Sequence, residues 1–393
     1  MRPLLALVAI LPLGAGYLAC GQASSTPDFG DDGGGSSSGS GSSSGTSSGG
    51  SSGSSGGSSG SSGSTSSSGS TSSSGSSSGS SGSSGGSSGS SSGCTTDTGP
   101  ISGTVGSTGG SVSRLVFAVV GDTRPATEDD VGGYPTAIIT KIFSDIQALS
   151  PRPVLTLGTG DYQFSNATSG TGAQQVDIYM TARQTYTGPF FPAPGNHECG
   201  VCGGVSSSDS ANCGMSDTSC GETVNYKAFL SSMLGPIAKT LPYYSINVTA
   251  ADSSWTAKFV VVGSNQWDST EATWLGTTLG QPTTYTFIVR HEPSDGTPPL
   301  GPGVAGADAI IPKYPYTLLI EGHDHTYGHY SDAPQAVIFG NGGAPPGGTK
   351  DYGYGLFAQR CDGAIVVDAI DYMSGAADSE FHFVVTPTGA ATK

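Results

Sequence analysis

The feature that most constrains this chain is a long run, from Gly33 to Gly93, that contains only glycine, serine and threonine. These residues bring almost no apolar surface, so the run can bury no core and is expected to remain a solvated coil. Flexible-chain scaling gives it a mean reach of roughly 40 to 50 Å, enough to hold a folded domain clear of a surface. We interpret residues 21–93 as a disordered tether, so the folded part of the chain must follow it.

The stretch before the tether is typical of a bacterial export signal. Arg2 precedes an apolar stretch from Leu4 to Leu13, which small residues and Cys20 follow. This stretch is too short to span a membrane as a helix, and a cysteine at its end favours lipoprotein processing over simple cleavage, although Tyr17 stands where leucine is usual. We expect residues 1–20 to be a lipoprotein signal peptide. The exported protein would then be anchored to a bacterial membrane, in the cell envelope or at the surface, through lipid on Cys20 alone.

The remaining residues, 94–393, are long enough for one large α/β domain with a sizeable core. The formal net charge of −16 lies almost wholly in this part of the chain. Such an acidic domain is not expected to take a nucleic acid as its main partner. A small phosphate ester is still compatible with it, because divalent ions would invert the local field where the phosphate binds. We expect a monomer.

Five short apolar runs each stop at side chains that could bind a metal ion. The last run, Tyr316 to Ile320, leads to His323 and His325, which two-residue alternation places on one side of an extended segment. The other four runs lead to Asp122, to Asp161, to Asn196 with His197 and Glu198, and to His291. Ligands of open α/β sheets bind beyond the carboxyl ends of the strands, so the pattern predicts one shared edge. Taken singly, each residue could equally be a turn residue, a helix cap or a core histidine.

The spacing of apolar residues predicts the order of helices and strands. An amphipathic helix is expected over Tyr134 to Leu149, with Pro135 at its start, between the first two apolar runs. This order predicts a βαβ unit with parallel strands. Further helices are expected over residues 174–186, 226–234 and 271–279, and further strands over 243–248, 258–262, 285–289, 337–339, 356–360, 364–371 and 381–385.

Two tetrapeptides, Gly195-Asn196-His197-Glu198 and Gly322-His323-Asp324-His325, occur in this order with Gly160-Asp161 before them and His291 between them. This series, from Leu115 to the C-terminus, resembles the calcineurin-like metallophosphoesterase family. The resemblance implies an α/β fold with a two-sheet β-sandwich flanked by helices. It also implies a metal-dependent phosphoester hydrolase, either a phosphatase or a phosphodiesterase. In such an enzyme a hydroxide that bridges two divalent ions attacks the phosphate ester in line.

The same resemblance assigns roles at the site. Asp161 would bridge two divalent ions, for which zinc, iron and manganese suit the imidazole and carboxylate ligands. His197 would not ligate, and would instead meet the phosphate or the leaving oxygen as a proton donor. The remaining ligands would be Asn196, His291 and His323 at one site and Asp122 and His325 at the other.

Arg124 departs from the family pattern, which usually has histidine at this position. A guanidinium has no lone pair, so Arg124 cannot ligate a cation. We expect it to hold phosphate oxygens bidentately and to leave the neighbouring metal site weak, with water, Tyr162 or Gln163 as additional ligands. A surface salt bridge with Glu128 or Asp129 is the alternative.

Six cysteines remain after Cys20, and an even number in an exported chain predicts disulfides. Four of them lie in a serine-containing insert, residues 199–220, that directly follows Glu198. We interpret the insert as a disulfide-stapled loop beside the site, with a structural zinc site as the alternative. The insert cysteines are Cys199, Cys202, Cys213 and Cys220, and the expected pair outside it is Cys94 with Cys361.

Two other functions stay open at this stage. One is a surface lipoprotein whose degenerate metallophosphoesterase fold binds without turnover, an alternative that only Arg124 favours. The other is a metal-dependent hydrolase of a different kind of substrate. The sequence also leaves open whether a phosphate substrate is a monoester, a diester, a nucleotide or a phospholipid head group.

Overall fold

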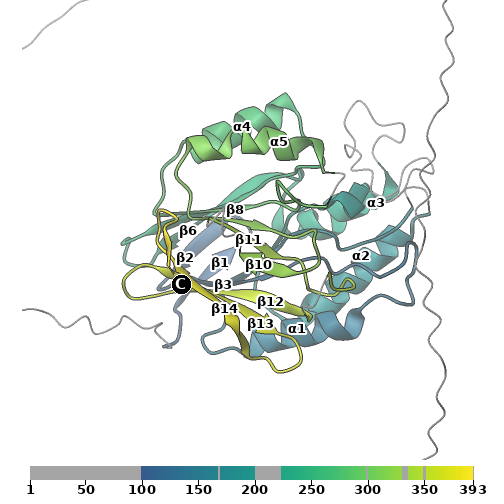
Figure 1. Ribbon diagram of the computed structural model, residues 1–393, viewed down its shortest axis with the longest axis horizontal. Helices are drawn as coiled ribbons and strands as arrows, with labels where there is room; N and C mark the ends of the chain where they lie inside the picture. The colour runs from purple at the N-terminus through teal and green to yellow at the C-terminus, as the bar shows by residue number, and fades with distance from the viewer. Residues whose placement is uncertain are drawn as a thin grey trace, which may run out of the picture. The chain divides into compact units, whose positions relative to one another are not determined.

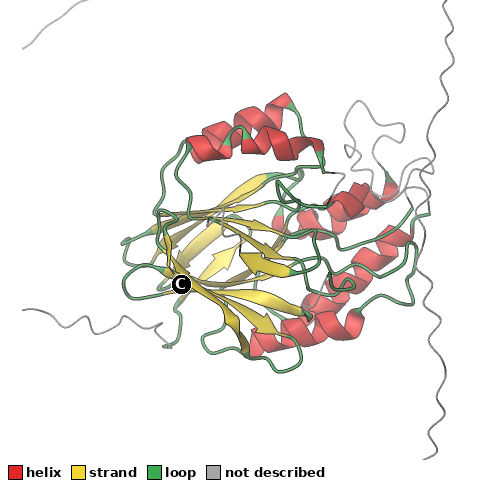
Figure 2. Cartoon of the chain, viewed as in Figure 1, coloured by secondary structure: helices red, strands yellow, loops and turns green. Residues whose placement is uncertain are grey.

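The computed structural model describes residues 99–166, 169–199, 223–297, 300–329, 335–347 and 351–392. Within these ranges the chain forms two β-sheets stacked face to face, with helices on both outer faces (Figures 1 and 2). The layers therefore run helix, sheet, sheet, helix. This confirms the predicted α/β fold class with a two-sheet sandwich flanked by helices. In the described ranges, no helix has the length and apolar character needed to cross a membrane.

The seven-stranded sheet begins with the predicted βαβ unit. The fully buried strand β3 (Val116–Val120) pairs in parallel with β4 (Leu155–Gly158), and β4 pairs in parallel with β5 (Phe190–Pro192). Helix α1 (Thr136–Ala148) connects β3 to β4, and α2 (Thr171–Ala182) connects β4 to β5. The antiparallel strands of this sheet are β12 (Gly353–Gln359), β13 (Ile365–Asp371), β14 (Ala377–Val385) and β15 (Ala391–Thr392), in the order β15-β14-β13-β12-β3-β4-β5.

The eight-stranded sheet has a parallel centre and antiparallel edges. Strands β7 (Thr256–Val261), β8 (Tyr285–Val289) and β9 (Leu318–Glu321) run parallel, with α4 (Ser269–Leu279) and α5 (Pro302–Asp308) in the connections. The other strands are β1 (Gly103–Gly106), β2 (Gly109–Val112), β6 (Tyr244–Ala250), β10 (Tyr327–His329) and β11 (Ala336–Phe339), in the order β1-β2-β6-β7-β8-β9-β11-β10.

Several elements differ from the sequence prediction. Strands β1 and β2 were not predicted, because their sequences GTVG and GGSV are rich in glycine and only pairing with the sheet makes them strands. Helix α5 was missed for the same reason, since PGVAGAD has weak helical propensity. The helix predicted over residues 226–234 is split into α3 (Val224–Ala228) and a π-helical segment, Phe229–Leu234.

Aromatic side chains fill the space between the two sheets. Phe117 on β3 meets Phe259 on β7 and Phe287 on β8 edge-on, at ring-centroid distances of 5.1 and 4.9 Å. It also stacks on Phe357 of its own sheet at 4.5 Å. These contacts join residues distant in sequence, so the two sheets pack as one sandwich. A second cluster, which includes Val260, Leu275, Ile288 and Ala307, lies between the eight-stranded sheet and helices α4 and α5.

The five runs that end at predicted ligands divide between the two sheets. Strands β3, β4 and β5 belong to the seven-stranded sheet, whereas β8 and β9 belong to the other. The expectation of one shared sheet edge is therefore wrong in detail. Because the sheets stack with these strands pointing the same way, their carboxyl ends meet at one end of the sandwich instead.

Most of the processing and cysteine predictions fall outside the described residues. These include the signal peptide, the tether, and the side chains of all the insert cysteines. Cys361 is described and is disulfide-bonded. Its partner lies outside the described residues, so the pairing with Cys94 stays a prediction.

Candidate metal centre

Two buried carboxylates lie side by side at one end of the sandwich. Asp122 follows β3 and Asp161 follows β4, and both are almost completely buried. Backbone hydrogen bonds join the two turns, because Asp122 N donates to Gly160 O at 3.0 Å and Thr123 N donates to Asp161 O at 2.9 Å. The two carboxylates and His291 offer ligand atoms that all lie within 4.8 Å of one another. This trio is the nucleus of the candidate site.

Four predicted ligands have a left-handed backbone, which is rare for residues other than glycine. The φ angles are 54° for Asp122, 58° for Asp161, 73° for His323 and 46° for His325. They make up four of the seven non-glycine residues with positive φ in the described part of the chain. Such conformations cost of the order of 1 kcal/mol or more each and gather at functional sites. The turns are therefore shaped to aim side chains rather than to maximise stability.

Each predicted histidine ligand has its outer ring nitrogen fixed by a backbone carbonyl. The pairs are His291 Nδ1 with Thr159 O at 2.8 Å, His323 Nε2 with Thr297 O at 2.7 Å, and His325 Nδ1 with Pro345 O at 2.9 Å. A carbonyl oxygen can only accept, so each of these nitrogens carries a proton. In the neutral ring the inner nitrogen then keeps a free lone pair. Outer partners of this kind orient histidines toward a metal.

The inner nitrogen of His291 is the centre of a first group of ligand atoms. His291 Nε2 lies 3.0 Å from Asn196 Oδ1, 3.3 Å from Asp161 Oδ1 and 3.3 Å from His323 Nδ1. With neutral rings all four atoms present lone pairs, which repel unless a cation or an added proton lies among them. Ligands 2.0–2.1 Å from a tetrahedral zinc ion are roughly 3.3 Å apart. The three distances to His291 Nε2 therefore match the spacing between two ligands of one divalent ion.

A second, looser group lies on the other side of Asp161. His325 Nε2 is 3.7 Å from Asp122 Oδ1. Asp161 Oδ2 points away from the first group, toward Arg124 Nε at 3.6 Å and His197 Nε2 at 3.7 Å. Asp161 therefore presents Oδ1 to the first group and Oδ2 to Arg124 and His197. The guanidinium occupies part of the space beside that second oxygen.

Tyr162 and Gln163, the additional ligands that the sequence suggested, both point elsewhere. The Tyr162 ring is buried and lies parallel to the Phe229 ring at 6.2 Å. Gln163 Nε2 donates to Glu198 O at 3.0 Å and to Asn225 O at 3.3 Å. The expectation is wrong because the chain turns inward after Asp161, where the aromatic ring gains more by burial under α2. The second group thus has fewer protein ligands than the first.

Glu198 is a buried carboxylate whose role the sequence alone does not indicate. Its oxygens accept hydrogen bonds from Gly195 N at 2.6 Å, Asp161 N at 2.8 Å and Tyr162 N at 2.9 Å. Burial, together with the charge of Asp161, raises the pKa of Glu198 to about 7. Glu198 therefore clamps the turn after β4 to the turn that carries Asn196. Its place at the end of the Gly-Asn-His-Glu block was the signal that could have identified it.

A buried ion pair joins the strands that carry the other histidines. Arg290, directly before His291, donates to Glu321 through Nε at 3.2 Å and Nη2 at 2.7 Å. Glu321 lies two residues before His323, and Arg290 Nη1 also reaches Asp308 of α5 at 2.7 Å. The pair therefore fixes the ends of β8 and β9 relative to each other. Nothing in the local sequence distinguishes it from a surface ion pair.

Glu292, on the other side of His291, anchors the following loop. Its carboxylate accepts hydrogen bonds from Ser264 Oγ at 2.7 Å, Asn265 Nδ2 at 2.8 Å and Gly301 N at 3.0 Å. All of these contacts lie away from the candidate metal ligands. Glu292 is thus a structural carboxylate that holds the β8 loop in place.

The two carboxylates and His291 influence each other's protonation. Burial raises the pKa of Asp122 well above its ordinary value, and the charge of Asp161 adds to this effect. Burial also acts to raise the pKa of Asp161, but His291, His197 and Arg124 outweigh it and hold that pKa well below its usual range. Burial acts to lower the pKa of His291, yet Asp161 and Asp122 raise it well above its ordinary value. In the metal-free cluster these shifts favour the protonated forms of His291 and Asp122 and the ionised form of Asp161.

Metal binding is expected to weaken as the pH falls, because an incoming ion must displace these protons. His291 and Asp122 hold protons below their raised pKa values and lose them as the pH rises, so metal affinity should increase as the pH rises through those values. Each displaced proton contributes up to about tenfold in Kd per pH unit. Competition with a chelator, using manganese or zinc, measures the slope. Asp122→Asn should make the dependence of metal affinity on pH shallower. A metal affinity that does not change with pH would show that binding displaces no protons from His291 and Asp122.

Comparisons with known proteins give likenesses of structure but not of sequence. No protein-family model and no curated protein matches the chain. A purple acid phosphatase from yellow lupin (Lupinus luteus) seeds aligns with a TM-score of 0.48 and 14% identity, over 68% of this chain and 53% of the lupin chain. A dimetal phosphatase from Danio rerio aligns with a TM-score of 0.46 and 14% identity, over 69% of this chain and 98% of its own. This chain thus spans about half the length of the lupin protein, and at these scores neither likeness assigns it a function.

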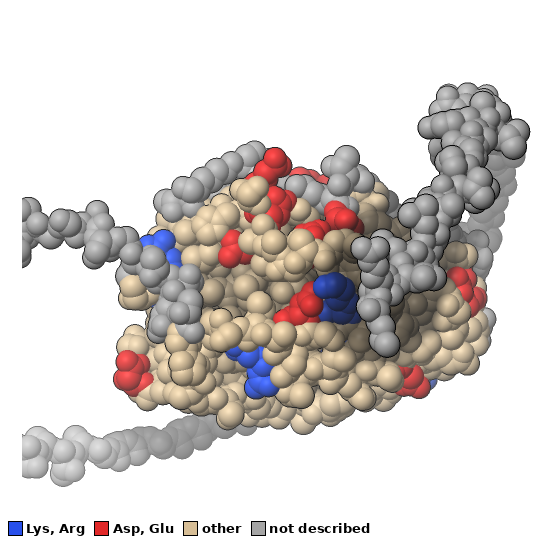
Figure 3. Space-filling model, turned by 90° about the horizontal axis from the view of Figure 1, so that it is seen from below, with Lys and Arg blue, Asp and Glu red and all other residues tan. Residues whose placement is uncertain are grey.

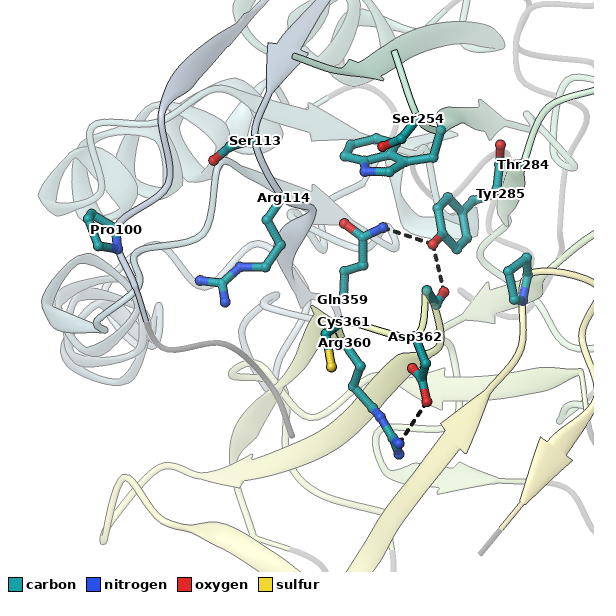
Figure 4. Close-up of a pocket in the computed structure, with 13 residues that line it drawn as sticks. Pro100, Ser113, Arg114, Ser254, Thr284, Tyr285, Gln359, Arg360, Cys361 and Asp362 are labelled. Carbon is teal, nitrogen blue, oxygen red and sulfur yellow. Dashed lines mark hydrogen bonds and ion pairs between the residues drawn. The ribbon is translucent and has the colours of Figure 1, made fainter. Parts of the chain in front are cut away.

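A separate pocket of about 540 Å³ lies at the opposite end of the sandwich (Figure 4). Its lining includes Arg114 before β3, Tyr285 at the start of β8, and Gln359 and Arg360 at the end of β12. Arg114 Nη2 donates to Gly99 O at 2.8 Å, so the described chain begins at this end. None of the predicted ligands lines the pocket, and the pocket is therefore distinct from the candidate centre.

Charged side chains are sparse on the face of the protein that Figure 3 shows. Figure 3 shows one face on which uncharged residues cover most of the described area and the basic side chains stand apart from one another. The sequence has 14 basic and 30 acidic residues. The visible face therefore has no basic stripe of the kind that tracks a nucleic-acid backbone.

Proposed function

We propose that this protein is a metal-dependent phosphoester hydrolase of the calcineurin-like metallophosphoesterase type, acting on a small phosphate ester. The observation that carries the proposal is the convergence of Asn196, Asp161 and His323 on His291 Nε2, with the outer nitrogen of each imidazole already engaged by a backbone carbonyl. The two tetrapeptides that provide Asn196 and His323 support the reaction class. We further propose two divalent ions, zinc, iron or manganese, with Asp161 between them.

The chain's own residues have separable tasks in this reaction. Divalent ions held at the two groups would supply Lewis acidity and a water of lowered pKa. Asp161 keeps one oxygen toward each group, and the backbone N–H of His197 donates to Asp161 Oδ1 at 3.1 Å, which fixes its direction. Burial lowers the pKa of His197 to about 3, so in the free site its ring is neutral and has one N–H to donate. That N–H is available to the phosphate or to the leaving oxygen.

The test is an assay of the full chain against phosphate monoesters and diesters in the presence of manganese, zinc and iron. We expect hydrolysis that a chelator abolishes and an added divalent ion restores. If the protein binds stoichiometric metal but hydrolyses no ester, the second candidate function is favoured, a degenerate surface lipoprotein that binds without turnover. The observation that supports this candidate is the position of Arg124 beside Asp161. Absence of bound metal under all conditions would overturn the proposal.

His197→Ala is expected to slow hydrolysis by about 10²- to 10⁴-fold while leaving metal content nearly unchanged. The reason is that His197 Nε2 is 3.7 Å from Asp161 Oδ2 and does not join the first group of ligand atoms. Metal analysis and steady-state kinetics on the same preparation measure both quantities. His382→Ala, at an exposed histidine paired with Asp368, is the matched control and should change neither. Loss of metal in His197→Ala would show that His197 is a ligand.

Arg124→His is expected to strengthen binding of the second ion and to raise KM for a phosphate ester. Arg124 Nε lies 3.6 Å from Asp161 Oδ2, so its charge disfavours a cation there, and its N–H groups could instead hold phosphate oxygens. No ion pair joins Arg124 to Glu128 or Asp129 among the described residues, whereas Asp129 accepts a hydrogen bond from Ser169 Oγ. Calorimetric metal titration should show one tight and one weak site in the wild type. Two equally tight sites, unchanged in the variant, would remove Arg124 from the chemistry.

We propose, in addition, that the protein is exported and lipid-anchored through Cys20. The apolar stretch before Cys20 and the tether after it support this location. Cys20→Ala should move the protein out of the membrane fraction, and unchanged fractionation would contradict lipidation.

A further inference from the structure

Phe164 lies between the two side chains that face the second oxygen of Asp161. The Arg124 guanidinium carbon is 4.6 Å from the centroid of the Phe164 ring. The His197 ring lies 4.5 Å from the same centroid, with an angle of 67° between the ring planes. One aromatic ring therefore contacts both the cation and the imidazole at the candidate centre.

The exposure of Phe164 sets it apart from the other phenylalanines. The remaining eleven in the described part of the chain are buried in the cores, whereas Phe164 is only half-buried. A residue that served packing alone would be expected to bury its ring. Phe164 thus combines a partly exposed ring with contacts to two side chains of the candidate centre that can donate hydrogen bonds.

The Arg124 guanidinium makes few hydrogen bonds within the described residues. Nη1 donates to Pro125 O at 3.1 Å, and the Nε atom is buried without a hydrogen-bond partner among the described residues. Besides this hydrogen bond, the guanidinium has the ion pair of Nε with Asp161 Oδ2 at 3.6 Å and the contact with the Phe164 ring. Cation–π contacts of this kind contribute about 0.5–2 kcal/mol, depending on desolvation. Leucine could fill the same space but offers no aromatic face.

We infer that Phe164 is a positioning residue. Its ring holds Arg124 and His197 side by side, so that both can donate hydrogen bonds to the substrate phosphate. The inference rests on the proposed function and adds a residue to it that no motif identifies. Phenylalanine has no lone pair, so Phe164 also offers nothing to a metal at the second group. Together, Phe164, Arg124 and His197 therefore favour binding of a phosphate over tight binding of a second metal ion on this side of Asp161.

Phe164→Leu tests the inference through binding of inorganic phosphate to the metal-loaded full chain, measured by calorimetry. We expect phosphate affinity to fall about five- to tenfold, with metal content unchanged. Phe164→Tyr keeps the ring and should retain most of the affinity. Trp255→Leu removes an aromatic side chain at the opposite end of the sandwich and controls for a general loss of stability. Phe164→Leu with the affinity of the wild type would overturn the inference.

A double variant shows whether Phe164 acts through Arg124. Arg124→Ala should weaken phosphate binding, and adding Phe164→Leu to it should cause less than a twofold further loss, because the contact between them is already gone. Fully additive losses would mean that Phe164 is only structural. If the wild type binds phosphate but hydrolyses no ester, the proposed function is wrong. The role of Phe164 in phosphate binding would still be decided by the same titrations. A wild type that binds no phosphate would overturn both.

Discussion

Asp161→Asn is expected to lower hydrolysis of a phosphate ester by about three orders of magnitude or more and to reduce the content of both metal ions together. The substitution keeps the shape of the side chain but removes its charge and one acceptor oxygen. Asp161 Oδ1 lies 3.3 Å from His291 Nε2 in the first group, while Oδ2 faces Arg124 and His197, on the side where we propose the second ion. Loss of this carboxylate therefore loosens both sites at once. Metal analysis of the purified variant, alongside kcat/KM, measures the two effects.

Asp177→Asn is the matched control for this variant. Asp177 is exposed on α2, remote from the site, and its replacement should leave metal content and turnover at wild-type levels. Asp122→Asn is informative in a different way, since it should weaken only the second group. If Asp161→Asn kept one ion at full occupancy, Asp161 would not be the bridge between the two groups.

Arg290→Met is expected to lower the free energy of unfolding by about 3–5 kcal/mol. Arg290 is completely buried, and the substitution leaves the buried carboxylate of Glu321 without its cation. It also removes the link to Asp308 on α5. Chemical denaturation, monitored in the metal-free protein, separates this loss from any loss of metal binding.

Removing both partners should recover much of the lost stability. Arg290→Met combined with Glu321→Leu leaves no unpaired charge in the core, so the double variant should be more stable than Arg290→Met alone. Arg360→Met removes an exposed ion pair with Asp362 and should cost only about 0–1 kcal/mol. If Arg290→Met and Arg360→Met lower the free energy of unfolding equally, the buried ion pair does not stabilise the ends of β8 and β9.

The parts of the site that could be predicted from the sequence are those whose chemistry lies in the side chain itself. The carboxylates and histidines follow apolar runs, and a strand end is the local context in which such residues are exposed to a common space. The βαβ unit around α1 was also predictable, because its apolar residues recur at helical spacing.

The outer partners of the histidines could not be predicted, for a physical reason. Thr159, Thr297 and Pro345 contribute only backbone carbonyl oxygens, which any residue would supply. Their position depends on loops that other contacts hold, as when Asp324 accepts hydrogen bonds from Thr297 N and Oγ1. The same limit applies to Phe164, whose importance comes from two neighbours that lie 40 and 33 positions away in the sequence.

The start of the described chain has a consequence for where this protein would find its substrate. Gly99 is bound to Arg114, at the amino end of β3, while Asp122 follows the carboxyl end of the same strand. The described chain therefore begins at the end of β3 that is remote from the candidate metal centre. If residues 21–93 are the flexible tether that their composition predicts, they would not fix which way the domain faces. Phosphate esters in solution and phosphate groups at a surface would then both be within reach of the candidate centre.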